Sequence, residues 1–368
     1  MNQRNRVLLF VLAFAAAAAA VGYGQWGYWR APGPSAPAPA PFALSVDGGV
    51  NQLVPASDIL SAGPAPDAMP AIDHPSFVAD AVADPYLKDD GLGIDVATAH
   101  GRRFYPFQIL VWHLAVNDVI DGTPVLVAFC PLCQDGGAYE RTVGGNVLQF
   151  GTAGQEWNST SLLYDVGSKT VWTAATALAL RGPMAGTRLT PVPSRIMTWA
   201  DWKKEYPDGN VLARVSGSDR DYTLDPYGSY AVDRRILFPI TRPDARLGVK
   251  DSVYGVSVGG ADKAYAASDV QQANVVNDRI GATPVSVWTF DGDGAEAFEA
   301  QANGKTLTFF RAGDGSTADR ETGSTWDDDG AAIAGPLRGS HLTRLPLERS
   351  FWYCWAGLHP QSMMYSSN

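Results

Sequence analysis

Two cysteines, Cys130 and Cys133, form the part of the chain with the most potential chemistry. The run that ends at Cys130 is rich in β-branched residues and predicts a strand, and the turn after it brings the two sulfur atoms close together. C-x-x-C spacing occurs in metal-binding pairs, redox disulfides and haem attachment sites. Haem attachment is excluded because Gln134 follows Cys133 where a histidine would be needed. Three other uses of the pair stay open: a metal site, a static or redox disulfide, and buried inert thiols.

Redox exchange of the thioredoxin type places the cysteine pair at a helix N-terminus, which lowers the pKa of one thiol. Here Gln134 to Gly137 lead from the pair into another strand, so no helix dipole is available. A metal site requires further ligands, and sulfur with imidazole suits copper or zinc. His113 lies shortly before the pair along the chain, and His359 lies near the C-terminus.

We therefore predict a metal site formed by Cys130, Cys133 and His113, with His359 completing it from the other end of the chain. We expect copper first, because the thiolate ligands are soft and the protein is expected outside the cytoplasm, and zinc second. We expect neither a nucleotide nor haem. No motif indicates a reaction, so whether the protein is an enzyme stays open. The alternatives to a metal-binding protein are a thiol–disulfide redox protein and a non-catalytic scaffold or binding module with a structural Cys130–Cys133 disulfide.

The elements that position these residues belong to an internal repeat. Residues 116–125 return as residues 276–285, and residues 182–190 return as residues 335–343. The chain therefore reads as two similar halves, residues 91–208 and 253–368, joined by a linking segment at residues 209–252.

The second half lacks the cysteine and histidine residues that form the predicted site of the first half. By position, His113, Cys130 and Cys133 correspond to Ala273, Phe290 and Asp293. The scaffold can thus be built without these residues, which favours a special role for them in the first half.

The fold class follows from strand and turn patterns. Short β-branched runs flank the turns at Asp121-Gly122 and Gly144-Gly145 and predict antiparallel hairpins. A short helix is predicted after Pro106, and residues 197–206 and 351–359 each predict a short helix with two tryptophans on one face. We predict a mostly antiparallel β-protein of the α+β type with a few short helices, in which two tandem pseudo-repeats pack together.

Composition and the N-terminus indicate the compartment. The net charge of −10 argues against a nucleic-acid partner. Within residues 1–30, Arg4 and Arg6 precede an apolar run, which predicts either a cleaved signal peptide or a retained membrane anchor. Residues 31–41 form a proline-rich linker, and residues 42–90 form an N-terminal extension of the globular body. We expect an extracytoplasmic, membrane-tethered or secreted protein whose contact with the membrane is its N-terminal segment.

The chain resembles a bacterial family, the domain of unknown function 3179. The matching motifs are Tyr105-Pro106, Ile109-Leu110, Trp112-His113, Val116-Asn117-Asp118, Cys130-Pro131-Leu132-Cys133, Asn158-Ser159, Tyr164-Asp165, Asp225-Pro226-Tyr227, Phe351-Trp352-Tyr353-Cys354-Trp355 and His359-Pro360. The resemblance implies a family but no activity. The chain departs from the family pattern at Leu114 and Thr160, where acidic residues are usual, and at Cys354, where a small residue is usual. These departures argue against carboxylate-based catalysis, and we do not include Cys354 in the predicted site.

Overall fold

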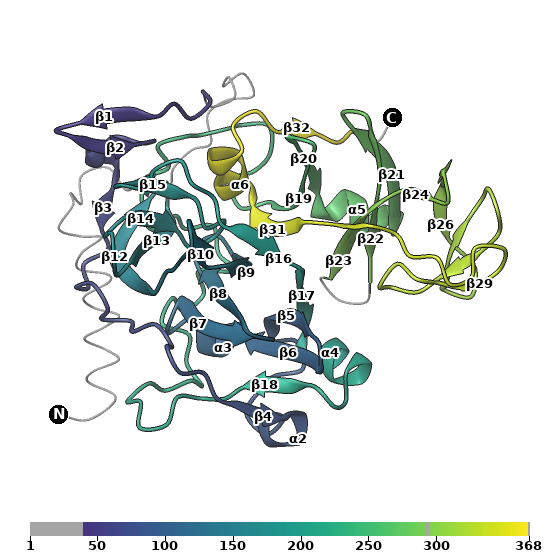
Figure 1. Ribbon diagram of the computed structural model, residues 1–368, viewed down its shortest axis with the longest axis horizontal. Coiled ribbons are helices and arrows are strands. Elements are labelled where there is room, and N and C mark those ends of the chain that lie inside the picture. The colour runs from purple at the N-terminus through teal and green to yellow at the C-terminus, as the bar shows by residue number, and fades with distance from the viewer. Residues whose placement is uncertain (1–39, 291–293, 367–368) are drawn as a thin grey trace.

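The structure is a computed structural model that describes residues 40–290 and 294–366. The chain is mostly antiparallel β-structure, which confirms the predicted fold class at this level. Two lobes are joined at an angle, so the molecule has an L-shaped outline (Figure 1). No helix in the described residues is long and apolar enough to cross a membrane. The predicted signal or anchor and most of the proline-rich linker lie outside the described residues.

Strands of the first half, with those of the N-terminal extension and β18 of the linking segment, form three larger sheets and one small hairpin. One sheet has the order β17 (Ser194–Thr198), β5 (Leu92–Thr98), β6 (Gly101–Pro106), β18 (Asn210–Leu212) and β4 (Phe77–Ala79). The next sheet has the order β16 (Thr190–Val192), β9 (Asp135–Glu140), β8 (Thr123–Cys130) and β7 (Ala115–Ile120). The largest has the order β1 (Ser45–Asp47), β2 (Val50–Gln52), β15 (Ala179–Arg181), β14 (Val171–Thr173), β13 (Thr160–Asp165), β12 (Phe150–Trp157) and β3 (Leu60–Ser61). The hairpin consists of β10 (Thr142–Val143) and β11 (Asn146–Val147).

Strands of the second half pair in closely similar orders. One sheet has the order β31 (Leu347–Phe351), β19 (Ser252–Val258), β20 (Ala261–Ala266) and β32 (Met363–Met364). Another has the order β21 (Val275–Ile280), β22 (Thr283–Thr289), β23 (Ala295–Glu299) and β30 (Arg344–Leu345). The last has the order β26 (Phe309–Arg311), β27 (Thr317–Asp319), β28 (Thr325–Trp326) and β29 (Ala332–Ala334), and β24 (Gln301–Ala302) with β25 (Lys305–Thr306) forms a hairpin.

The helices of the described residues are all short. They are the 3-10 helix η1 (Ala56–Asp58) and the α-helices α2 (Asp80–Ala83), α3 (Phe107–Leu110), α4 (Trp199–Glu205), α5 (Ala267–Ala273) and α6 (Trp352–Leu358). The predicted helices after Pro106, near residue 200 and near residue 355 are confirmed as α3, α4 and α6. The linking segment has no helix or strand between residues 213 and 251.

Turn chemistry explains why the hairpins form where the sequence predicts them. Asp121 and Gly122 have positive φ angles of 50° and 82°, as a two-residue hairpin turn requires, and Ile120 pairs with Thr123 across them. Gly144 and Gly145 form the second predicted turn with φ angles of 57° and 81°.

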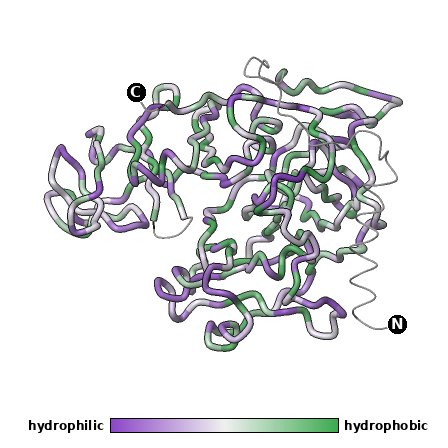
Figure 2. The backbone as a smooth tube through the Cα atoms, turned by 180° about the vertical axis from the view of Figure 1, so that it is seen from behind, coloured by the Kyte–Doolittle hydropathy of each residue, from purple (hydrophilic) through white to green (hydrophobic). Residues whose placement is uncertain are grey.

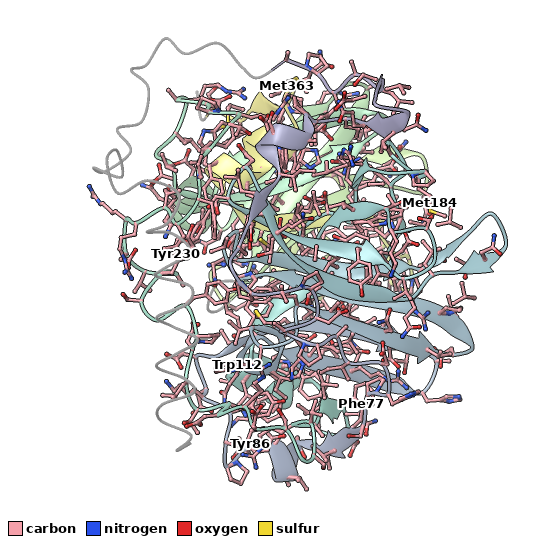
Figure 3. All side chains as sticks on the ribbon, turned by 90° about the vertical axis from the view of Figure 1, so that its left-hand side faces the viewer. Phe77, Tyr86, Trp112, Met184, Tyr230 and Met363 are labelled. Atoms are coloured by element: carbon pink, nitrogen blue, oxygen red, sulfur yellow. The ribbon has the colours of Figure 1, made fainter. Side chains whose placement is uncertain are left out.

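Strands that are buried over continuous runs of residues, such as β8, β13 and β22, build the apolar cores of the two halves. Apolar and polar stretches alternate along the backbone in both lobes (Figure 2). Side chains fill the space between the ribbons, and Trp112 lies inside the first half (Figure 3). The main core of the first half also includes Phe351, Tyr353, Cys354 and Leu358 from the C-terminal segment. Helix α6 therefore packs on the first half, although it is far away in sequence. On its other side, Trp352, Trp355 and Ala356 join Val253 and Ala264 in a core of the second half.

Candidate functional site

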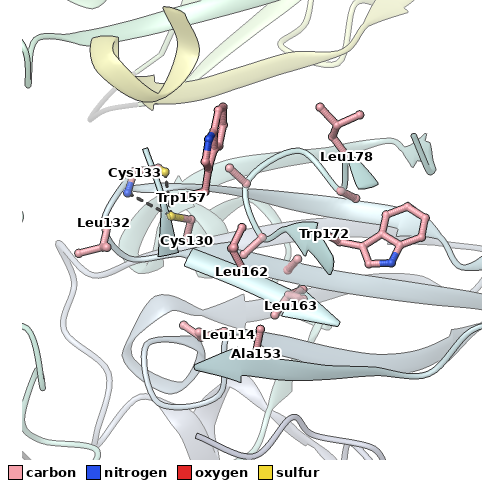
Figure 4. Packing of buried hydrophobic residues seen from close by; sticks show 14 of the residues in the cluster. Leu114, Cys130, Leu132, Cys133, Ala153, Trp157, Leu162, Leu163, Trp172 and Leu178 are labelled. Carbon is pink, nitrogen blue, oxygen red and sulfur yellow. Dashed lines mark hydrogen bonds between the residues drawn. The ribbon is translucent and has the colours of Figure 1, made fainter. Parts of the chain in front are cut away.

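The two cysteines of the C-x-x-C motif lie on the loop between β8 and β9. Strand β8 ends at Cys130, which pairs with Asp135 at the start of β9. The N–H of Cys133 donates to the carbonyl of Cys130 at 3.1 Å, and Gln134 takes a positive φ of 53° that returns the chain to the sheet. This tight loop places the sulfur atoms of Cys130 and Cys133 2.8 Å apart, and both cysteines are free thiols (Figure 4).

Cys130 is the more acidic of the two thiols. The backbone N–H groups of Cys133 and Ser161 each donate to its sulfur at 3.3 Å. Burial alone raises the pKa of Cys130, but hydrogen bonds from Cys133 and Ser161 outweigh burial and bring that pKa below its ordinary value. The pKa of Cys133 is raised well above its ordinary value by burial and by the neighbouring Cys130. The loop thus shifts the pKa values of its two thiols in opposite directions, that of Cys130 downward and that of Cys133 upward.

A third thiol, Cys354 on α6, completes the cluster. The hydroxyl oxygen of Thr160 lies 3.5 Å from the sulfur of Cys133 and 3.6 Å from that of Cys354. All three cysteines are fully buried, and burial raises the pKa of Cys354. The sequence prediction left Cys354 out. The available sequence signal was that Thr160 and Cys354 both depart from the family pattern. In the structure these two residues contact each other.

Hydrogen bonds hold α6 over the cysteine loop. The hydroxyl of Tyr353 donates to the carbonyl of Leu132 at 2.6 Å, and the N–H of Phe351 donates to the carbonyl of Cys133 at 2.9 Å. The amide of Asn158 donates to the carbonyl of Tyr353 at 3.3 Å. Asn158 and Ser159 form the turn between β12 and β13 with positive φ angles of 51° and 56°. The site is therefore assembled from two turns of the first half and the C-terminal helix.

A buried carboxyl group, Glu156 on β12, lies next to the thiols. The hydroxyl of Ser161 donates to Glu156 Oε1 at 3.2 Å, while its backbone N–H donates to Cys130. Within the described residues, Glu156 Oε2 has no hydrogen-bond partner. Burial, followed by the charge of Cys130, raises the pKa of Glu156 well above its ordinary value. The sequence analysis did not identify Glu156, because the residues next to it in the sequence do not indicate that it lies beside the thiols.

His113 is buried and has partners for both ring nitrogens. Nδ1 lies 2.6 Å from the carbonyl oxygen of Pro70, and Nε2 lies 2.7 Å from the hydroxyl of Tyr222. Burial lowers the pKa of His113, so its neutral form is favoured. Its ring therefore connects the N-terminal extension to the linking segment.

His359 lies at the C-terminal end of α6 between two carboxylates. Nδ1 is 3.1 Å from Asp262 Oδ2, and Nε2 is 3.4 Å from Glu348 Oε2. Burial alone lowers the pKa of His359, but Glu348 and Asp262 outweigh burial and raise it. The ring also stacks on Trp355, with centroids 3.8 Å apart.

The structure brings the two predicted cysteine ligands together but gives each predicted histidine ligand other partners. In the described part of the chain, no group of three or more His, Cys, Asp or Glu residues is arranged to hold a metal ion. A copper or zinc site formed by Cys130, Cys133, His113 and His359 therefore stays a prediction.

The fold and the site define an antiparallel β-protein with a buried cluster of three thiols under its C-terminal helix. The chain belongs to the protein family of unknown function DUF3179, whose family model matches residues 66–362. No curated protein and no solved structure matches the chain. Four of the motifs that carry the family resemblance meet around the thiols, and these are residues 130–133, 158–159, 225–227 and 351–355.

Proposed function

We propose that the protein is a thiol–disulfide redox protein whose reacting groups are Cys130 and Cys133. The observation that carries the proposal is the 2.8 Å separation of their sulfur atoms, with two backbone N–H groups donating to Cys130. A thiolate is the reactive form of cysteine, and hydrogen bonds that stabilise it favour exchange. Backbone donors from the loop and from β13 thus take the role that a helix N-terminus has in other C-x-x-C proteins.

The proposed reaction is exchange with an incoming small disulfide. The Cys130 thiolate attacks one sulfur of that disulfide, and the other sulfur leaves as a thiolate. Cys133 then loses its proton and attacks the sulfur of Cys130, which releases the rest of the reagent as a second thiolate. The cysteine pair loses two electrons and the reagent is reduced to two thiols. Because both sulfurs are fully buried, exchange requires the loop at residues 131–134 to open.

Thiol counting on the full chain tests this proposal. After incubation with oxidised glutathione, acid quenching and unfolding, we expect the wild type to keep one of its three thiols and Cys354→Ser to keep none. Cys130→Ser should react at least about tenfold more slowly, because the remaining thiols have raised pKa values. A wild type that keeps three thiols, or a Cys130→Ser variant that reacts at the wild-type rate, would contradict the proposal.

The third thiol favours a second candidate function, the binding of a soft metal ion. Three thiolates are a donor set that selects Cu(I) over harder cations. The described residues form no ready-made site, so Cys130, Cys133 and Cys354 would have to separate slightly around the ion. We expect one Cu(I) per reduced chain in competition with a chromogenic chelator, and at least about tenfold weaker binding by Cys354→Ser. If Cu(I) binding is not stoichiometric, or if Cys354→Ser binds as tightly as the wild type, this candidate fails.

We also infer that the two halves are structural repeats, as the sequence predicts. Support comes from the matching orders β16-β9-β8-β7 and β30-β23-β22-β21, and from β18 and β32, which run parallel to β6 and β20. Asp165 and Asp319 each accept a hydrogen bond from a tryptophan seven residues later. An experimental structure in which the two sets of strands do not superpose would contradict this inference.

Export and attachment to a membrane are part of the proposal. They are supported by the apolar run within residues 1–30 and the proline-rich residues 31–41. An oxidising compartment would supply the disulfides with which the cysteine pair exchanges. Fractionation of cells that express the full chain checks this location, and recovery of the protein in the cytoplasm would contradict it.

A further inference from the structure

We propose that the cleft between the two halves of the chain binds a small hydroxylated amine of the amino-sugar class. None of the residues that line this cleft belongs to the thiol cluster. The proposal therefore adds a second site to the molecule and does not rest on the redox function proposed above.

The cleft lies at the inner corner of the L. Strand β17 and helix α4 of the first half form one wall, and β23 and the loop between β28 and β29 of the second half form the other (Figure 1). Its volume is about 480 Å³. Sites for small molecules usually have volumes of about 300–1,000 Å³, so the cleft is large enough for a single sugar ring.

Acidic side chains outnumber basic ones on the walls of the cleft. The acidic residues are Asp201, Glu205, Asp327, Asp328 and Asp329, and the basic residues are Arg195 and Lys204. A cleft in which one sign of charge predominates concentrates ligands of the opposite sign. The cleft therefore favours a ligand with a positive charge.

Asp328 is the carboxylate best placed to bind that charge. Its neighbour Asp329 forms an ion pair with Arg344 at 2.6 Å, whereas Asp328 Oδ1 lies 3.8 Å from Arg311 Nη1 and its side chain is 50 % exposed. Burial raises the pKa of Asp328, Arg311 lowers it, and the charge of Glu205 on the opposite wall raises it again. An ammonium group between Asp328 and Glu205 would relieve the repulsion between these two carboxylates.

Arg195 on β17 supplies a buried hydrogen-bond donor. Its side chain lines the cleft, is 4 % exposed, and donates through Nη2 to Glu205 and to the hydroxyl of Tyr206. Its Nε lies 3.4 Å from Asp95 Oδ2 and 3.8 Å from Glu296 Oε1. Within the described residues this Nε has no hydrogen-bond partner. Because buried polar atoms are usually hydrogen-bonded, the Nε–H group indicates a ligand with an oxygen acceptor.

That acceptor oxygen should be uncharged. Asp95, Glu205 and Glu296 all form ion pairs with Arg195, so a carboxylate or phosphate on the ligand would be repelled by three carboxylates. A hydroxyl oxygen accepts a hydrogen bond without this cost. The surroundings of Arg195 therefore favour a hydroxyl group over an anion.

An apolar surface completes the lining of the cleft. Ile196 and Met197 lie on one wall, and Ala295 lies on the other. Such a surface suits the C–H groups of a compact ligand. An ammonium group, several hydroxyl groups and a C–H surface occur together in an amino sugar, which is why we choose this class of ligand.

The test is calorimetric titration of the full chain with glucosamine, at mildly acidic pH where the amine of the sugar carries a proton. N-acetylglucosamine is the matched neutral probe, because acetylation keeps the ring and its hydroxyl groups but removes the charge. We expect saturable binding of one glucosamine per chain and at least about tenfold weaker binding of N-acetylglucosamine.

Variants of the acidic residues locate the binding site. Asp328→Asn removes the charge with little change in size and should weaken the binding of glucosamine at least about tenfold. Glu205→Gln should have an effect in the same direction, which keeps the proposal testable if one variant fails to fold. Asp47→Asn is the control, because Asp47 is exposed on β1, far from the cleft (Figure 1). It should bind glucosamine as the wild type does.

Three results would overturn the proposal. The first is that the folded wild type shows no saturable binding of glucosamine. The second is that N-acetylglucosamine binds as tightly as glucosamine, and the third is that Asp328→Asn and Glu205→Gln both bind glucosamine like the control. None of these measurements depends on the redox state of the thiols, so the proposed redox function stands or fails separately.

Discussion

Replacing Gly357 with alanine is expected to lower the free energy of unfolding by about 1–3 kcal/mol. In an ordinary helix the same change stabilises by roughly 0.5–1 kcal/mol. The sign reverses here because a Cβ atom at Gly357 would lie 2.2 Å from the side-chain nitrogen of Asn158. Asn158 has little freedom to move, since it donates to the carbonyl of Tyr353 and accepts from the N–H of Arg242 at 2.8 Å. The clash therefore pushes α6 away from the thiols.

Urea unfolding of the full chain measures this effect, with Gly313→Ala as the matched control. A Cβ atom at Gly313 would meet nothing within 4 Å, so the control should change stability by less than about 0.5 kcal/mol. Equal stability of Gly357→Ala and the control would show that α6 does not pack on Asn158 as described.

Replacing His359 with glutamine is expected to cost about 3–5 kcal/mol at mildly acidic pH, because it leaves Asp262 and Glu348 without a buried cation. The two carboxylates raise the pKa of His359 above its value in the unfolded chain. The stabilisation is therefore complete below the unfolded pKa of about 6.5 and is lost as pH rises through the folded pKa. The difference between wild type and variant should shrink as the solution becomes alkaline.

Thermal and urea unfolding across the pH range test this prediction, and His341→Gln is the control because His341 is exposed. The control should follow the wild-type curve at every pH. A stability difference between wild type and His359→Gln that stays constant or grows with pH would contradict a charged His359 in the folded protein.

Local features of the fold could be predicted from the sequence because they depend on local chemistry. The turn at Asp121-Gly122 follows from residues that tolerate positive φ, and α4 follows from the spacing of Trp199 and Trp202. Both tryptophans are fully buried. The proximity of Cys130 and Cys133 was also predictable, because one short loop determines it.

The rest of the site depends on contacts between residues that are distant in sequence. Cys354 meets Thr160 only because α6 packs on the first half, and Glu156 meets Cys130 only because β12 and β13 lie beside the cysteine loop. His113 and His359 attract attention in the sequence as possible ligands. Their ring nitrogens instead face groups whose proximity no spacing rule predicts.

The most direct test of the redox function is the midpoint potential of the Cys130–Cys133 pair in the full chain, measured from both the oxidised and the reduced side. Hydrogen bonds to the Cys130 sulfur stabilise the reduced form, and such stabilisation raises the potential. We predict one reversible two-electron transition above about −300 mV, the level below which structural disulfides lie. A pair that stays oxidised below that potential, or that never forms a disulfide, would contradict the account.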